Sequence, residues 1–156
     1  MTIPPNETPL NLIRGPARQP GWAQLMRLGG DGVAILLDEL RKSVGRIDGV
    51  VERLHYSARE ARWLIRYDMG NVEVFAVRIS PGLLQADMAL NSSEVVQLLR
   101  DRKLSGTVKD AVRVGPTELG SRLVRLPLKD RRGVRAFVNL ARAKNRLIAK
   151  AGSTPH

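Results

Sequence analysis

The chain contains no cysteine among its 156 residues and has no long hydrophobic run. The missing thiols exclude disulfide bonds, thiolate metal ligands and cysteine nucleophiles. The longest uninterrupted apolar run is VAILL at residues 33–37, far below the roughly 20 residues that cross a bilayer, so we expect no transmembrane helix. The first residues do not show a basic segment followed by an apolar one, which leads us to expect a cytoplasmic protein without a secretory leader.

Residues that commonly carry catalysis are also scarce. The two histidines are His55, inside an expected strand, and His156 at the end of the sequence, and neither has an acid–base or metal-ligand partner at a recognisable spacing. No HExxH, GxSxG or EF-hand pattern occurs. We therefore expect a non-enzymatic protein with neither a cofactor nor a metal.

Aromatic residues make up 4% of the chain. Proteins that bind single-stranded nucleic acid stack the bases on exposed aromatic side chains. Most of the aromatic residues here fall on apolar faces of expected helices and strands, where they are needed for the core. Any contact with nucleic acid is therefore expected from Arg and Lys side chains to the phosphate backbone of duplex DNA or structured RNA.

Hydrophobic periodicity predicts an α+β fold. Apolar residues at helical spacing from Val33 to Val44 predict a helix that is capped by Asp31 and stops at Gly45. Four strands follow with short turns between them, which forces neighbouring strands to be antiparallel. A later fifth strand contains Pro127, which cannot donate to a ladder and is expected at a sheet edge. The strands are expected at residues 50–57, 62–68, 72–80, 83–90 and 122–128, which gives an antiparallel β-meander of about four to five strands with helices packed mainly on one face.

The remaining segments complete one domain. Asn91, followed three residues later by Glu94, is typical of a capping box and predicts a helix to about Lys103, whereas residues 107–114 favour no single type of element. We expect residues 21–150 to form a single α+β domain. Residues 1–20 are expected as a proline-rich, extended or disordered tail that could join a homo-oligomer, and residues 151–156 as a disordered C-terminus.

The formal net charge is +11, and the whole excess lies in the last third of the chain. Residues 1–99 hold 11 Lys and Arg and 11 Asp and Glu, whereas residues 100–156 hold 15 and 4. Such an uneven distribution is typical of a surface that faces a polyanion.

The segment from Asp130 to Lys150 predicts a basic amphipathic helix with Asp130 as its N-cap. At 100° per residue, the apolar residues occupy one arc and most cations occupy another. Lys144 falls inside the apolar arc and is expected to snorkel or to mark the rim of the helix. The apolar arc comprises Val134, Phe137, Val138, Leu140, Ala141, Leu147 and Ile148; the candidate binding residues are Arg131, Arg132, Arg135, Arg142, Arg146 and Lys150 of this helix, with Arg122 and Arg125 of the preceding strand.

These features favour a polyanion-binding module that binds the nucleic-acid backbone without sequence specificity. The alternative is an adaptor or structural protein whose basic helix docks on an acidic protein partner. A plain solvated face is the simplest structural explanation, since Lys and Arg near a helix C-terminus complement its dipole. It leaves unexplained why no acidic residue follows Asp130 to relieve the repulsion among the cations. A membrane surface is not expected, because the helix lacks Trp and has few large apolar anchors.

Two stretches, RWLIRYDMGNVEVFAVRISPGLLQADMAL at residues 62–90 and LVRLPLKDRRGVRAFVNLARAK at residues 123–144, carry a resemblance in element order and hydrophobic rhythm. Over about residues 31–150 the chain resembles small uncharacterised bacterial α+β domains of the MmcQ/YjbR-like group. The resemblance implies a compact antiparallel sheet with helices on one side and no shared catalytic motif. Some members of that group are loosely called DNA-binding.

Overall fold

The computed structural model describes residues 19–153, which form one antiparallel sheet of six strands and five helices. The helices are α2 (Trp22–Leu28), α3 (Asp31–Val44), α4 (Ser92–Arg100), α5 (Gly106–Val114) and α6 (Arg131–Ser153). The strands are β1 (Val50–Ser57), β2 (Arg62–Met69), β3 (Val72–Ser80), β4 (Leu83–Leu90), β5 (Thr117–Glu118) and β6 (Ser121–Pro127). The strand order is β1-β2-β3-β4-β6-β5, and the predicted α+β fold with an antiparallel meander is confirmed.

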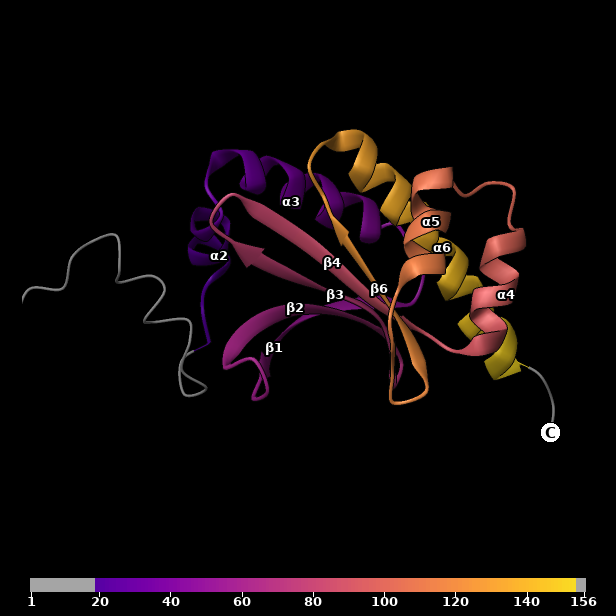
Figure 1. Cartoon of the computed structure of the whole chain (residues 1–156). Helices are drawn as coiled ribbons and strands as arrows, with labels where there is room; N and C mark the ends of the chain where they lie inside the picture. The colour runs from indigo at the N-terminus through magenta and orange to yellow at the C-terminus, as the bar shows by residue number, and fades with distance from the viewer. Residues whose placement is uncertain (1–18, 154–156) are drawn as a thin grey trace, which may run out of the picture.

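The helices form a layer on one side of the sheet, as Figure 1 shows for α3, α4, α5 and α6. Alternate residues of β4 point toward this helix layer, so Leu84, Ala86 and Met88 are buried. Gln85 and Asp87 point to the opposite side, which no described helix covers in Figure 1 and which we call the open face. The hydrophobic core therefore lies between one face of the sheet and the helix layer.

Three aromatic rings anchor α6 to the middle of the sheet. Phe75 on β3 stacks on Tyr67 of β2 with ring centroids 4.5 Å apart, and it meets the edge of Phe137 on α6 at 4.8 Å. All three side chains are almost completely buried. Aromatic pairs at these separations add to the stabilisation from buried area, by roughly 0.5–1.5 kcal/mol for each pair. The contacts fix which face of α6 points inward.

A β-bulge interrupts the pairing of β2 with β3. Tyr67 pairs with Phe75 and the next residue, Asp68, pairs with Glu73, so Val74 is an extra residue in β3. A bulge locally disrupts the hydrogen-bond ladder and changes the direction of the backbone groups around it. The carbonyl groups of Glu73 and Val74 are consequently available to a side chain from another element.

Several element boundaries differ from the sequence-based expectation. Helix α4 has the predicted Asn91–Glu94 capping box, but it ends at Arg100 because Asp101 is extended, at φ −73° and ψ 114°. The N-cap of α3 is Gly30, and Asp31 is the first residue of the helix. The segment that favoured no element is α5, which begins after Ser105, whose Oγ accepts a hydrogen bond from the amide of Val108.

The sixth strand, β5, was not predicted. It pairs with β6 through a tight turn in which Leu119 and Gly120 have φ of 50° and 82°, the left-handed geometry of a type I′ hairpin. Leucine is not typical of such turns, so the sequence did not predict the hairpin that contains β5. Because β5 pairs with Arg122 and Ser121 at the other end of β6, the Pro127 end of β6 pairs within the described residues with β4 alone, as expected for a proline.

The expected domain limits at residues 21 and 150 stay a prediction. Helix α6 continues to Ser153, past the expected end of the domain. Most of the predicted N-terminal tail, residues 1–18, lies outside the described residues, as do residues 154–156.

Candidate nucleic-acid interface

Helix α6 is embedded in the helix layer over most of its circumference. Its core-facing residues from Val134 to Ala141 are buried, and so are Ala143 and Asn145, which lie toward its two flanks, whereas Leu147 and Ile148 near its end are partly buried. On one flank, the side-chain amide of Asn145 donates to the carbonyl oxygen of Asp48, just beyond α3, at 3.3 Å. On the other flank, Arg146 lies beside Asp101 at the end of α4. The exposed part of α6 is therefore a narrow strip along the outside of the helix layer.

Cations dominate this exposed surface. Between Arg131 and Lys150 eight residues are exposed and six of them are cationic, whereas the other two are Asn139 and Ala149. With a rise of 1.5 Å per residue, the cations extend over about 28 Å of the helix axis. We call these six residues the basic strip: Arg131, Arg132, Arg135, Arg142, Arg146 and Lys150.

The arginines of the basic strip differ in their partners from the paired arginines of the sheet and of α3. Within the described residues, Arg131, Arg132, Arg135 and Arg142 form no ion pair, and Arg146 lies 3.9 Å from Asp101. The charges of Arg131, Arg132, Arg135 and Arg142 are therefore not neutralised by an ion pair within the described residues. The sheet and α3 instead hold closely paired arginines: Arg41 with Glu52 at 3.1 Å, Arg53 with Asp68 at 2.7 Å, Arg66 with Asp68 at 2.6 Å, and Arg78 with Glu60 at 2.7 Å and with Asp87 at 3.0 Å.

The structure does not bring Arg122 and Arg125 to the basic strip. Nη1 of Arg122 donates to the carbonyl oxygens of Val112 and Arg113, both at 3.1 Å, and so caps the C-terminal end of α5. Arg125 lies on the open face, opposite Asp87 in the β4–β6 register, and its Nε is 3.9 Å from that carboxylate. Of the eight residues predicted for the interface, six share one surface and these two lie elsewhere.

A second group of cations lies beside the basic strip and was not among the predicted site residues. Arg100, Arg102 and Lys103 are exposed at the end of α4 and in the turn that follows. Asp101, in the middle of this group, approaches Arg146 of α6 and so brings the turn next to the strip. The excess of cations that begins at Arg100 was the sequence signal for this group, but it did not show that the turn and α6 are neighbours.

Lys144 does not snorkel: it is only 4% exposed. Its ammonium group donates to three backbone carbonyl oxygens, those of Glu73 at 3.1 Å, Val74 at 3.0 Å and Ala89 at 2.7 Å. Three acceptors match the three donors of a lysine ammonium group. Burial lowers the pKa of Lys144 from its usual value, and the charges of Glu94 and Glu73 oppose that shift.

These hydrogen bonds give Lys144 a structural role. Two of the three carbonyls belong to the bulge in β3 and the third to β4, so the side chain ties α6 to two strands. A cleft of about 650 Å³ between α4 and the end of α6 is lined in part by Lys144. Since the backbone already accepts all three of its hydrogen bonds, Lys144 has no donor left for a ligand there.

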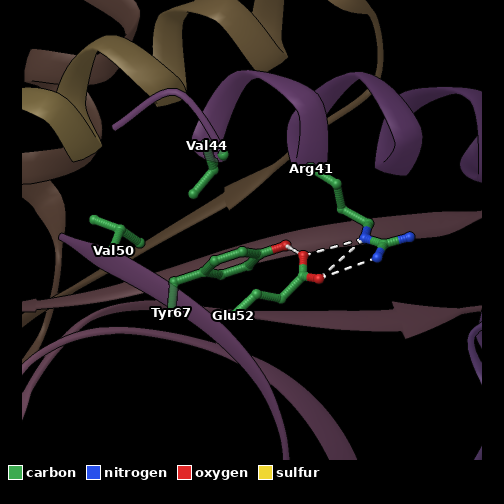
Figure 2. A pocket seen from close by; sticks show the side chains of 6 residues that line it. Arg41, Val44, Val50, Glu52 and Tyr67 are labelled. Atoms are coloured by element: carbon green, nitrogen blue, oxygen red, sulfur yellow. Dashed lines mark hydrogen bonds and ion pairs between the residues drawn. The ribbon is translucent and has the colours of Figure 1, made fainter. Parts of the chain in front are cut away.

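A second polar cluster joins α3 to the edge strand β1. Figure 2 shows the Tyr67 hydroxyl and the Arg41 guanidinium group both directed at the carboxylate of Glu52. Tyr67 donates to Glu52 at 2.8 Å, and Arg41 donates through Nε and Nη2 at 3.1 Å each. The Arg41 guanidinium group also lies 3.8 Å from the centroid of the Trp22 ring.

The small pocket beside this cluster, about 130 Å³, has few polar groups free to bind a ligand. The carboxylate of Glu52 is occupied by internal donors on two sides, and the charge of Arg41 is paired. Both side chains are only about a quarter exposed, at 25% and 29%. The cluster therefore serves to fix α3 and α2 against the β1 end of the sheet.

We expect Tyr67 to remain protonated as long as the protein is folded. Burial, followed by the negative charge of Glu52 and the hydrogen bond to it, raises the pKa of the Tyr67 hydroxyl far above its usual value, while Arg41 opposes the shift. A raised folded-state pKa stabilises the fold below the unfolded pKa of about 10, and this contribution is lost as the pH rises beyond it. In a Tyr56→Phe variant, tyrosinate absorbance should therefore appear only together with alkaline unfolding seen by circular dichroism. Reversible ionisation of the folded variant would contradict this assignment.

The described residues contain no group of three or more His, Cys, Asp or Glu side chains arranged to hold a metal ion. None of the helices in residues 19–153 is both long and apolar enough to cross a membrane. Comparisons of the chain with protein-family models, with curated proteins and with solved structures found no match. The resemblance to the MmcQ/YjbR-like group therefore stays a prediction.

Proposed function

We propose that this protein binds the phosphate backbone of nucleic acid through the basic strip of α6, without reading the base sequence. One observation carries the proposal: six of the eight exposed residues from Arg131 to Lys150 are cations, and four of their guanidinium groups form no ion pair within the described residues. Duplex DNA presents one negative charge for about every 1.7 Å of its axis. A row of cations about 28 Å long can contact several phosphates at once.

The shape of the helix layer favours backbone contact over base reading. A helix that reads bases enters the major groove and presents side chains from a protruding surface. The flanks of α6 are buried at Ala143 and Asn145, so only a narrow strip of the helix is exposed. The strip also contains no aromatic residue on which an unpaired base would stack. A duplex that lies across the strip needs neither a protruding helix nor exposed aromatic residues, because it is bound by its phosphates.

Nucleic acid fits the strip better than an acidic protein does. Stable protein interfaces are centred on buried aromatic and aliphatic anchors, with charges at the rim. Between Arg131 and Lys150 the exposed residues other than the cations are Asn139 and Ala149, so the strip provides no such anchor. Phosphate recognition requires none, because charge-assisted hydrogen bonds from Arg provide the attraction.

A salt titration tests the proposal. If all six cations contact phosphates, log K should fall linearly with log salt with a slope of about −5, which is about a thousandfold loss of affinity from about 50 to about 200 mM salt. The measurement is fluorescence anisotropy of a labelled duplex longer than the strip, made with two unrelated sequences. Equal affinity for both sequences is expected.

Poly-glutamate serves as the matched acidic polypeptide probe. Tighter binding of poly-glutamate than of duplex at equal ionic strength, or no duplex binding at low salt, would overturn the nucleic-acid proposal in favour of an acidic protein partner. A duplex affinity that does not change with salt would contradict phosphate contact by the strip.

A further inference from the structure

The turn between α4 and α5, which includes Asp101, Arg102 and Lys103, borders the basic strip and is held in a defined shape. Oδ1 of Asp101 accepts a hydrogen bond from the amide of Lys103 at 2.9 Å. Leu104 is buried beneath the turn, and the hydroxyl of Ser105 caps α5. A turn fixed in this way presents its exposed cations without a large entropic cost on binding.

Asp101 places its second carboxylate oxygen against the strip. Its Oδ2 lies 3.9 Å from Nη2 of Arg146, and the Arg146 side chain is 60% exposed. This separation is too long for a direct hydrogen bond, and exposed ion pairs of this kind are weak. A phosphate oxygen can approach a guanidinium group to about 2.7–2.9 Å and make a charge-assisted hydrogen bond. Phosphate is therefore a better partner for Arg146 than Asp101 is.

We propose that the α4–α5 turn is a second arm of the same nucleic-acid surface, and that Asp101 competes with the phosphate backbone for Arg146. This inference rests on the proposed function. Arg100, Arg102 and Lys103 add three exposed cations beside the strip, and Asp101 is the carboxylate among them. When a phosphate binds Arg146, the Asp101 charge opposes it at short range, so Asp101 sets an upper limit on the affinity and on the number of phosphates that are contacted.

The test is the isosteric substitution Asp101→Asn. It removes one negative charge while its remaining side-chain oxygen still accepts the hydrogen bond from Lys103. We expect the affinity for duplex to rise by about three- to tenfold at low salt, and the salt slope to steepen by up to about 0.9, the value for one added phosphate contact. The matched control is Glu118→Gln, which removes one negative charge from a similarly long exposed pair, that of Glu118 with Arg59 at 3.7 Å.

The outcomes separate this inference from the proposed function. If wild-type protein binds duplex and charge reversal in the basic strip weakens that binding at least about a hundredfold, but Asp101→Asn raises affinity no more than Glu118→Gln does, the competition by Asp101 is refuted and the proposed function stands. If wild-type protein does not bind duplex at low salt, this inference and the proposed function both fail.

The contribution of the α4–α5 turn is tested by the double substitution Arg102→Glu with Lys103→Glu. This variant should bind duplex at least tenfold more weakly. Unchanged binding would show that the turn is not part of the nucleic-acid surface.

Discussion

Reversing two charges in the basic strip, with Arg135→Glu and Arg142→Glu together, is expected to weaken duplex binding by at least about a hundredfold at low salt, because two attractions become two repulsions. The salt slope of the remaining binding should be shallower by about 2, in line with the loss of two phosphate contacts. Both side chains are exposed and form no ion pair within residues 19–153, so the fold should tolerate the change. Anisotropy titrations give the affinity, and thermal unfolding checks the fold.

A matched control makes the same change in net charge at other exposed arginines. Arg27 lies on α2, and Arg59 lies in the turn between β1 and β2; Figure 1 shows both segments at the opposite end of the molecule from most of α6. The double substitution Arg27→Glu with Arg59→Glu should weaken binding by no more than a few-fold, through the long-range field alone. If the control loses as much affinity as the strip variant, binding depends on net charge and not on α6.

The largest loss of stability is expected from Lys144→Met. Methionine has a similar length but no donor, so the carbonyls of Glu73, Val74 and Ala89, of which that of Val74 is buried and the other two are partly buried, lose their shared partner. An unsatisfied buried acceptor costs about 1–3 kcal/mol, and removal of the buried charge offsets part of the total. We expect the free energy of unfolding to fall by about 3 kcal/mol, which corresponds to a decrease in Tm of about 10 °C for a domain of this size.

The control for this prediction lies two residues earlier on the same helix. Arg142→Met also replaces a long cation with methionine, but at an exposed position without a described ion pair, so its effect on stability should stay within about 0.5 kcal/mol. The two substitutions should also differ in their effect on binding. Arg142→Met should weaken duplex binding, whereas folded Lys144→Met should retain it. Equal stability of the two variants would show that Lys144 does not hold α6 on the bulge.

The phase of α6 was predictable because it depends on local periodicity alone. A period of 3.6 residues places Val134, Phe137 and Leu140 on one side and Arg135 and Arg142 on another, whatever the helix packs against. The meander was predictable for a similar reason. Strands that alternate in polarity and are joined by turns such as Met69–Val72 and Ser80–Leu83 have to pair with their neighbours in antiparallel order.

The sequence was less informative where a side chain finds its partner far along the chain. Lys144 was predicted to snorkel because a lone lysine in an apolar arc usually does. Its actual partners depend on the bulge at Val74, which is 70 residues away in the sequence and results from the register of β2 against β3. Local periodicity does not determine such a register shift.

The sequence alone determined the α+β class and predicted a C-terminal helix with its cations on one side, because composition and periodicity act within each element. The tertiary structure decided which cations share a surface. Packing turns Arg122 to the end of α5, places Arg125 on the open face, and brings Asp101 and its neighbouring cations beside Arg146. Those placements depend on how helices and strands pack against one another, and residues of the same charge therefore have different partners and different roles.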